Sequence, residues 1–135
     1  MRTSSLVMAL MLGIVGNAAA QPAPPLLREP LGLDASYTTT VLTVDILPAG
    51  KAPPTTIGTP GHRHPGSTYA YVLTGEVVNR LGDAPEVRFK AGQAWSETPN
   101  QPHFIVNASA TVPAKLLVVM VTPKAMTTLT EPLPK

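Results

Sequence analysis

The sequence predicts a small all-β domain, either a barrel or a two-sheet sandwich, and three observations favour it. The 135 residues include 16 prolines, which are disfavoured inside helices and central strands. Hydrophobic residues make up 44% and charged residues only 13%, too apolar and too weakly charged for a disordered chain. Many short segments of strand character follow one another at near-even spacing between turn signals. The length suits one domain.

Residues 1–20 have the three parts of a secretory signal peptide. Arg2 supplies the positive start, Leu6–Val15 is an apolar run, and Ala18–Ala20 offers a small-x-small cleavage site. The run is too short to span a bilayer, which needs roughly 20 residues. We therefore expect cleavage after Ala20, a periplasmic or secreted protein, and no stable membrane insertion afterwards. The alternative is a membrane anchor that is retained.

The remaining chain divides into three parts. Residues 21–35 are rich in proline and lack apolar periodicity, so we expect an extended N-terminal arm. Residues 36–125 are expected to form the β-barrel, and residues 126–135 a weak C-terminal tail. The predicted strands are Tyr37–Leu47, Thr68–Leu73, Glu76–Arg80, Glu86–Lys90, Ala94–Glu97, His103–Asn107 and Ala114–Val121. Glycine, proline or asparagine stands at the turns between them, and 51–61 is predicted to be a loop.

Several classes of function are excluded by what the chain lacks. It has no cysteine, so it forms no disulfide, thiolate zinc site or cysteine nucleophile. Removing residues 1–20 takes away Arg2 and leaves nine Lys and Arg against eight Asp and Glu, a net charge of 9 − 8 = +1. Without a basic cluster, and with few aromatic residues, nucleic acid is not an expected partner. No Gly-x-Ser-x-Gly, P-loop or dinucleotide fingerprint is present.

The chain contains three histidines, His62, His64 and His103. The first two form His-x-His, and residues two apart in a strand point to the same face. Imidazole is a good ligand for Fe, Mn, Ni and Zn. His103 begins a later predicted strand, and in a small barrel it can face the first two across the interior. The alternative is that the three side chains only pack or face solvent.

Two segments resemble the two motifs of the cupin family. His62–Glu76 matches the first motif, which has His-x-His, a carboxylate four residues later, and then Tyr-Val-Leu-x-Gly-Glu. Gly92–Asn107 matches the second motif, which has Gly, Pro, His and then Asn four residues beyond the His. The resemblance implies the cupin double-stranded β-helix, a jelly-roll barrel. It also implies that His62, His64 and His103 hold a divalent metal ion.

The chain departs from the motifs in four ways. The leading Gly of the first motif is only bracketed by Gly58 and Gly61, and the Pro-to-His spacing of the second motif is one residue shorter than its longest form. Thr68 stands where the first motif usually has its Glu, and Gln101 stands where the second usually has Gly. The usual set of three histidines and one glutamate is thereby reduced to three neutral ligands. Such a set leaves the ion its full +2 charge and two or three open positions, which favours an anionic or enolate-type substrate.

Five other residues are candidates for the surroundings of the site. Thr68 can hydrogen-bond a metal-bound water, and Ala70 and Val72 share its strand face and can line an apolar pocket. Glu97 and Trp95 share one face of their strand. If that face is the interior, Glu97 can replace the missing carboxylate as a ligand or act as a general base. Surface carboxylates are the norm, so a rim position with a salt bridge or hydrogen bond is favoured for Glu97.

The resemblance implies a metal-dependent enzyme acting on a small oxygen-chelating metabolite. With iron, dioxygenase-type oxidation is expected; with Zn or Mn, lyase or isomerase chemistry is expected. The alternative is a non-catalytic barrel that binds a small ligand, with a structural metal or none. We also expect a homodimer, because small cupins often pair through sheet edges or exchange an N-terminal strand.

Overall fold

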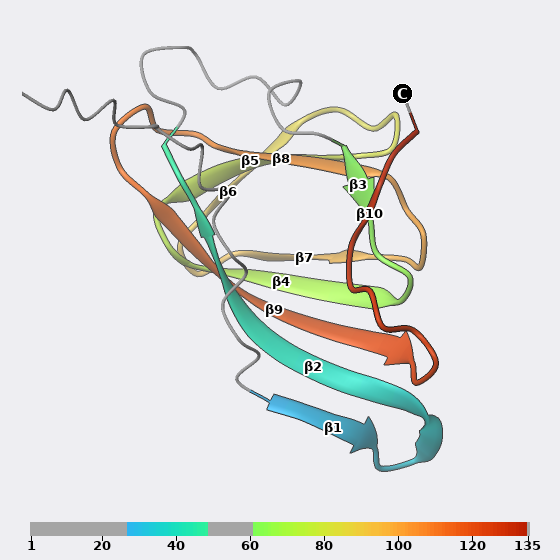
Figure 1. Ribbon diagram of the computed structural model, residues 1–135. Coiled ribbons are helices and arrows are strands. Elements are labelled where there is room, and N and C mark those ends of the chain that lie inside the picture. The colour runs from blue at the N-terminus through green and yellow to red at the C-terminus, as the bar shows by residue number, and fades with distance from the viewer. Residues whose placement is uncertain (1–26, 49–60, 135) are drawn as a thin grey trace, which may run out of the picture.

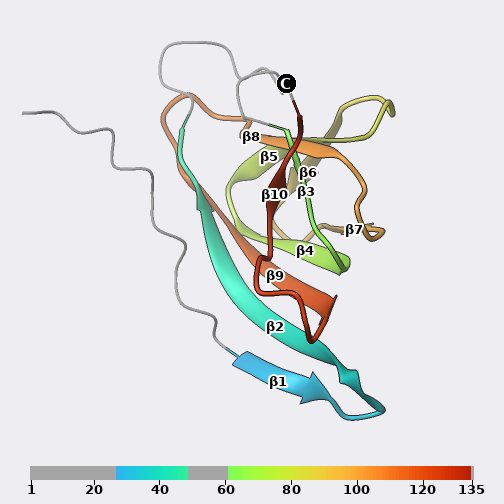
Figure 2. The same ribbon diagram turned by 45° about the vertical axis from the view of Figure 1, so that its right-hand side comes forward.

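The computed structural model describes residues 27–48 and 61–134, which form ten strands in two antiparallel sheets (Figures 1 and 2). The predicted signal peptide 1–20, the first part of the predicted arm and nearly all of the predicted loop 51–61 lie outside these residues. In the described part, no helix has the length and apolar character needed to cross a membrane. The predicted all-β class is confirmed.

Each sheet has five strands, and the two sheets face each other in both views. The order in the first sheet is β1 (Leu27–Leu31), β2 (Asp34–Ile46), β9 (Ala114–Pro123), β4 (Ser67–Thr74) and β7 (Ala94–Glu97). The order in the second sheet is β10 (Glu131–Pro132), β3 (His62–Arg63), β8 (His103–Asn107), β5 (Glu76–Leu81) and β6 (Val87–Lys90).

Alternation of side chains along the strands places the core between the sheets. On β4, Thr68, Ala70 and Val72 are buried, whereas Tyr69 and Tyr71 are 52% and 43% exposed on the outer face. The strand face expected to turn inward therefore does so. The core combines both sheets: Leu42, Ala70, Val72, Val77, Trp95, Ile105, Ala114, Leu116, Val118 and Met120.

Gly75 is the corner at which the chain leaves the first sheet for the second. It alone separates β4 from β5, with φ at +78°. A Cβ at this position would also lie 2.7 Å from the Cα of Ala114. Glycine is required here because an L side chain meets both the positive φ and the backbone of β9.

Three strands were not predicted from the sequence. The end of the expected arm, Leu27–Leu31, pairs with β2; Pro30 is tolerated because this is an edge strand. The other two are β3 and β10, only two residues each, which pair with one another. Part of the expected C-terminal tail therefore lies beside the histidine segment, as Figure 1 shows.

Asn107 fixes the end of β8. Its side-chain amide donates to the carbonyls of Ile46 and Val112 at 2.8 and 2.9 Å, and its Oδ1 accepts from the Ser109 N–H at 2.7 Å. One buried side chain thus joins the end of β2, the end of β8 and the loop before β9. The matching residue of the second motif has a structural role.

Replacing Asn107 by Ala is expected to lower the free energy of unfolding by about 1–3 kcal/mol, because buried backbone groups lose their partners. Urea denaturation measures this change. Asn100→Gly is the matched control: Asn100 is exposed at φ +61°, a conformation that glycine adopts freely, so its effect should stay within about 0.5 kcal/mol. Equal stability of Asn107→Ala and the wild type would show that these bonds contribute nothing.

Candidate metal centre

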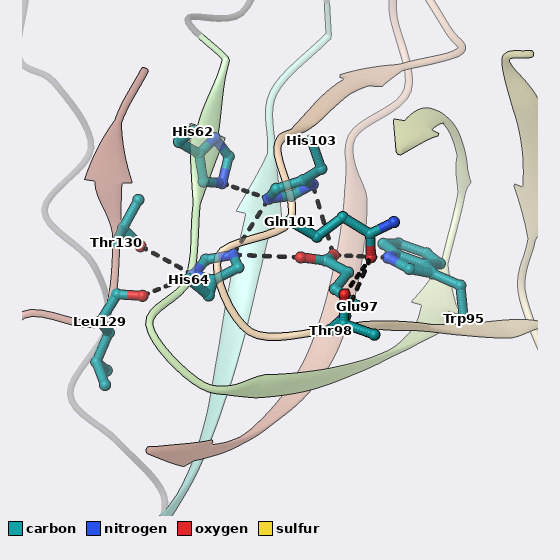
Figure 3. Close-up of polar contacts among 9 residues, drawn as sticks. All are labelled: His62, His64, Trp95, Glu97, Thr98, Gln101, His103, Leu129 and Thr130. Atoms are coloured by element: carbon teal, nitrogen blue, oxygen red, sulfur yellow. Dashed lines mark hydrogen bonds and ion pairs between the residues drawn. The ribbon is translucent and has the colours of Figure 1, made fainter. Parts of the chain in front are cut away.

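The three histidine rings point toward one another, as Figure 3 shows, and can hold one ion between them. The strands β3 and β8 pair at His62 and His103, which sets these two residues side by side. His64 follows β3 directly and turns its ring to the same point. The Nε2 atom of His103 lies 2.7 Å from Nε2 of His62 and 3.1 Å from Nε2 of His64. One ligand atom from each ring lies within 4.8 Å of the others.

The backbone of the C-terminal tail orients His64. Its Nδ1 lies 2.6 Å from the Leu129 carbonyl oxygen, so the Nδ1–H donates and the lone pair remains on Nε2. This is the usual way in which a protein fixes a ligating histidine, with one nitrogen bonded to an acceptor and the other directed at the metal. The tautomer of His64 is therefore the one that suits a ligand through Nε2.

Burial keeps the His103 ring neutral. The side chain is 4% exposed, and desolvation, together with His62 and His64 nearby, lowers its pKa to about 3. A neutral imidazole has a lone pair to offer a metal ion, whereas an imidazolium does not. His103 is thus in its ligating form at neutral pH.

Glu97 lies against the histidines and is 3% exposed, so the favoured rim position was wrong. Its Oε1 accepts a hydrogen bond from the Trp95 indole at 2.8 Å and lies 3.5 Å from Nδ1 of His103. Its Oε2 lies 3.7 Å from Nε2 of His64. Burial raises the pKa of this carboxyl, and the Trp95 hydrogen bond and His64 act in the opposite direction.

The remaining predicted residues divide between the site and the core. Thr68 pairs in register with Glu97, and its hydroxyl is buried without a hydrogen-bond partner in the described part of the chain. Ala70, Val72 and Trp95 belong to the hydrophobic core, with Trp95 also reaching Glu97. Ala70 and Val72 were expected to line an apolar pocket, and the structure places them within the packed core.

Sequence reasoning missed the part played by the tail. Besides the Leu129 carbonyl, Glu131 forms a 3.0 Å ion pair with Arg63, which points away from the histidines as its parity in the strand requires. A backbone carbonyl carries no sequence signal. The sequence offered one clue to the position of the tail: Glu131 has the charge to pair with Arg63, which stands between His62 and His64.

Comparison with known families now decides the assignment. The cupin domain model matches residues 50–120, more than half of the chain, and this range contains all three histidines and Glu97. The chain belongs to the cupin family. No protein of curated function matches it in sequence.

Solved structures show the same fold. A conserved protein with a double-stranded β-helix domain from Klebsiella pneumoniae is 19% identical, with TM-score 0.53, over 87% of this chain and 89% of that one. The DMSP lyase DddQ from Ruegeria pomeroyi is 21% identical, with TM-score 0.52, over 74% and 46%. Hydroxypropylphosphonic acid epoxidase from S. wedmorenis is 22% identical, with TM-score 0.52, over 74% and 64%. This cupin therefore matches less than two thirds of either enzyme's length.

The residues of this cupin fit a divalent metal ion. Three imidazole nitrogens converge, and a carboxylate oxygen beside them, Glu97 Oε2, is buried with no hydrogen-bond partner among the described residues. Such an orphaned atom is costly in a structure without a ligand to use it. The donor set of imidazole and carboxylate suits Fe, Mn, Ni and Zn.

The metal-free protein is expected to lose stability as the pH falls from about 6.5 towards 3. His103 titrates at about 3 when folded and near 6.5 when unfolded, so only the unfolded chain takes up this proton within that window. The free energy of unfolding should fall by up to about 1.4 kcal/mol per pH unit. Urea denaturation in a chelator at several pH values measures the slope.

The His103→Asn variant isolates the contribution of His103 to this slope. Such a comparison is needed because the raised pKa of Glu97 changes stability with pH in the opposite direction, and because His62 and His64 also face the His103 ring. The variant should show a shallower decline over the window. If the free energy of unfolding falls equally with pH in the wild type and in His103→Asn, the lowered pKa of His103 is contradicted.

Proposed function

We propose that this cupin is a metal-dependent enzyme acting on a small oxygen-chelating metabolite. One observation carries the proposal: the Nε2 atoms of His62, His64 and His103 converge at a largely buried point inside the barrel. Such close convergence of three imidazole nitrogens is what a metal site requires. The family membership supports the same interpretation.

His62, His64 and His103 would hold a divalent ion, Fe, Mn, Ni or Zn. When bound, that ion supplies Lewis acidity for lyase or isomerase chemistry or, if it is iron, dioxygenase-type oxidation. The chain's own residues orient the site: the Leu129 carbonyl fixes His64, and the Trp95 indole, from the hydrophobic core, fixes Glu97. Glu97 would supply the acidic side chain of the site, since its oxygens lie 3.7 Å from Nε2 of His64 and 3.5 Å from Nδ1 of His103.

The charge of the surroundings supports an oxygen-chelating substrate. Among the described residues no lysine or arginine side chain is buried, so no buried cation is available there to pair with a substrate phosphate or carboxylate. Threonine hydroxyls and apolar side chains form the inner faces of β2 and β4. A substrate would be held chiefly through oxygens that reach the metal.

Thr68, in place of the motif's Glu, also supports a second candidate, a barrel that binds a small ligand without turnover. The two differ in the fate of the ligand. Recovery of a tightly bound compound unchanged after long incubation favours the binding protein. Depletion at a rate that follows metal occupancy favours the enzyme.

We also propose that the protein is exported and that it forms a homodimer. Arg2, the apolar run Leu6–Val15 and the Ala18–Ala20 site support cleavage and a periplasmic or secreted location. The outward tyrosines 69 and 71 on β4 give the first sheet an apolar outer face that suits a second copy. Cell fractionation and light scattering test these two points.

Elemental analysis is expected to find close to one metal ion per chain in wild-type protein purified without chelator or nickel resin. His103→Ala and His62→Ala should each lose most of it, because each removes a ligand. Arg88→Ala is the control, since Arg88 is exposed and pairs with Glu76 on β5. A folded wild type without metal, together with unchanged properties of His62→Ala, would contradict the proposal.

A further inference from the structure

The Glu97 carboxylate is more deeply buried than a surface or structural role explains. It sits at the end of β7 with one oxygen, Oε1, bonded to the Trp95 indole. The other oxygen, Oε2, has no hydrogen-bond partner among the described residues and faces His64 (Figure 3). A buried carboxylate oxygen without a donor is unfavourable unless a cation or a proton neutralises it.

We propose that Oε2 of Glu97 is the fourth ligand of the metal centre, supplied from β7 in place of the carboxylate missing at position 68. This inference rests on the proposed function, because it requires that the three histidines bind a metal ion. It adds one residue to the ligand set and changes the charge of the site.

The distances between the histidine nitrogens fit a shared ion, and Oε2 of Glu97 lies just outside that range from His64. Two ligand atoms that each lie about 2.1 Å from one metal are about 3.0 Å apart in adjacent octahedral positions and about 3.4 Å apart in a tetrahedron. The observed separations are 2.7 and 3.1 Å between histidine Nε2 atoms and 3.7 Å from Glu97 Oε2 to Nε2 of His64. A small movement of the Glu97 side chain would bring Oε2 to the distance from His64 Nε2 that two ligands of one ion require.

The pairing of β4 and β7 explains how the carboxylate can come from another strand. Thr68 and Glu97 are directly opposite one another in register, and both side chains are buried. Residues opposite each other in antiparallel strands have Cβ atoms about 4.5–5.5 Å apart, so a carboxylate on either strand can serve one point. In this chain the strand next to β4 carries the acid, and β4 itself carries the hydroxyl.

Trp95 and His103 hold the carboxylate in the required orientation. The indole N–H fixes Oε1 at 2.8 Å, and Nδ1 of His103 lies 3.5 Å from the same oxygen. Rotation about the last side-chain bond is thereby restricted, which leaves Oε2 as the free oxygen. If Glu97 served only to accept from Trp95, a neutral amide would do so without a buried charge.

A fourth ligand narrows the substrate class. With one carboxylate the centre carries a net +1 charge, and an octahedral ion keeps 6 − 4 = 2 open positions. Two positions suit a compound that chelates through two oxygens, such as an enediol, a hydroxyketone or a hydroxy acid. A substrate of this class would fill the coordination sphere without a further protein cation.

The first test measures Co²⁺ affinity of the full chain by competition with a coloured chelator. Glu97→Gln keeps the acceptor for Trp95 and removes the charged ligand, so the affinity should fall at least about 100-fold, beyond the usual 10- to 100-fold for a residue that only supports a ligand. The Co²⁺ absorption spectrum should change as well. Glu76→Gln, a partly exposed carboxylate paired with Arg88, is the matched control and should bind like the wild type.

The second test needs no variant and remains decisive if Glu97→Gln fails to fold. A crystal structure of the wild type with Co²⁺ should place Oε2 within about 2.2 Å of the ion. A metal held by the three histidines with Oε2 more than about 3 Å away, or an unchanged affinity of Glu97→Gln, overturns this inference but leaves the proposed function intact. Failure of the wild type to bind Co²⁺ overturns both.

Discussion

The structure depends on three imidazole rings held in contact within the barrel. Their centroids lie 4.0–5.1 Å apart. Burial and mutual proximity act together here: both lower the pKa of His103. The site is thereby prepared for a metal ion before any ion binds, and its geometry is set by the pairing of β3 with β8.

The rest of the barrel encloses and orients the three histidine rings. The two sheets enclose them, the core packs beneath them, and the tail brings a carbonyl to His64. The short pairing of β10 with β3 and the ion pair between Arg63 and Glu131 secure that tail. Two-residue strands contribute little to a sheet by themselves, so their value lies in where they place the Leu129 carbonyl and the His62 ring.

The interior also contains polar atoms that a purely structural core would avoid. Thr40, Thr68 and Asn79 have buried side-chain atoms with no partner among the described residues, in addition to those of Glu97 and His103. In register, Thr40, Met120, Thr68 and Glu97 form one row across the first sheet. Thr40, Thr68 and Glu97 thus carry unsatisfied atoms in one row, which indicates a face built for a ligand at some cost in stability.

The sequence by itself determined the fold class, most of the strands and the three histidines, because alternation, turn residues and motif spacing are local properties. It also determined that Ala70 and Val72 turn inward, since parity along a strand is fixed by the backbone. The place of Glu97 was decided only by the tertiary structure. Alternation along the strand predicted which face Glu97 shares with Trp95, but its burial beside the histidines depends on the pairing of β7 with β4 and on the second sheet, which carries His62 and His103. The same holds for the Leu129 carbonyl: a backbone acceptor has no residue type, so only the folded chain could bring it to His64.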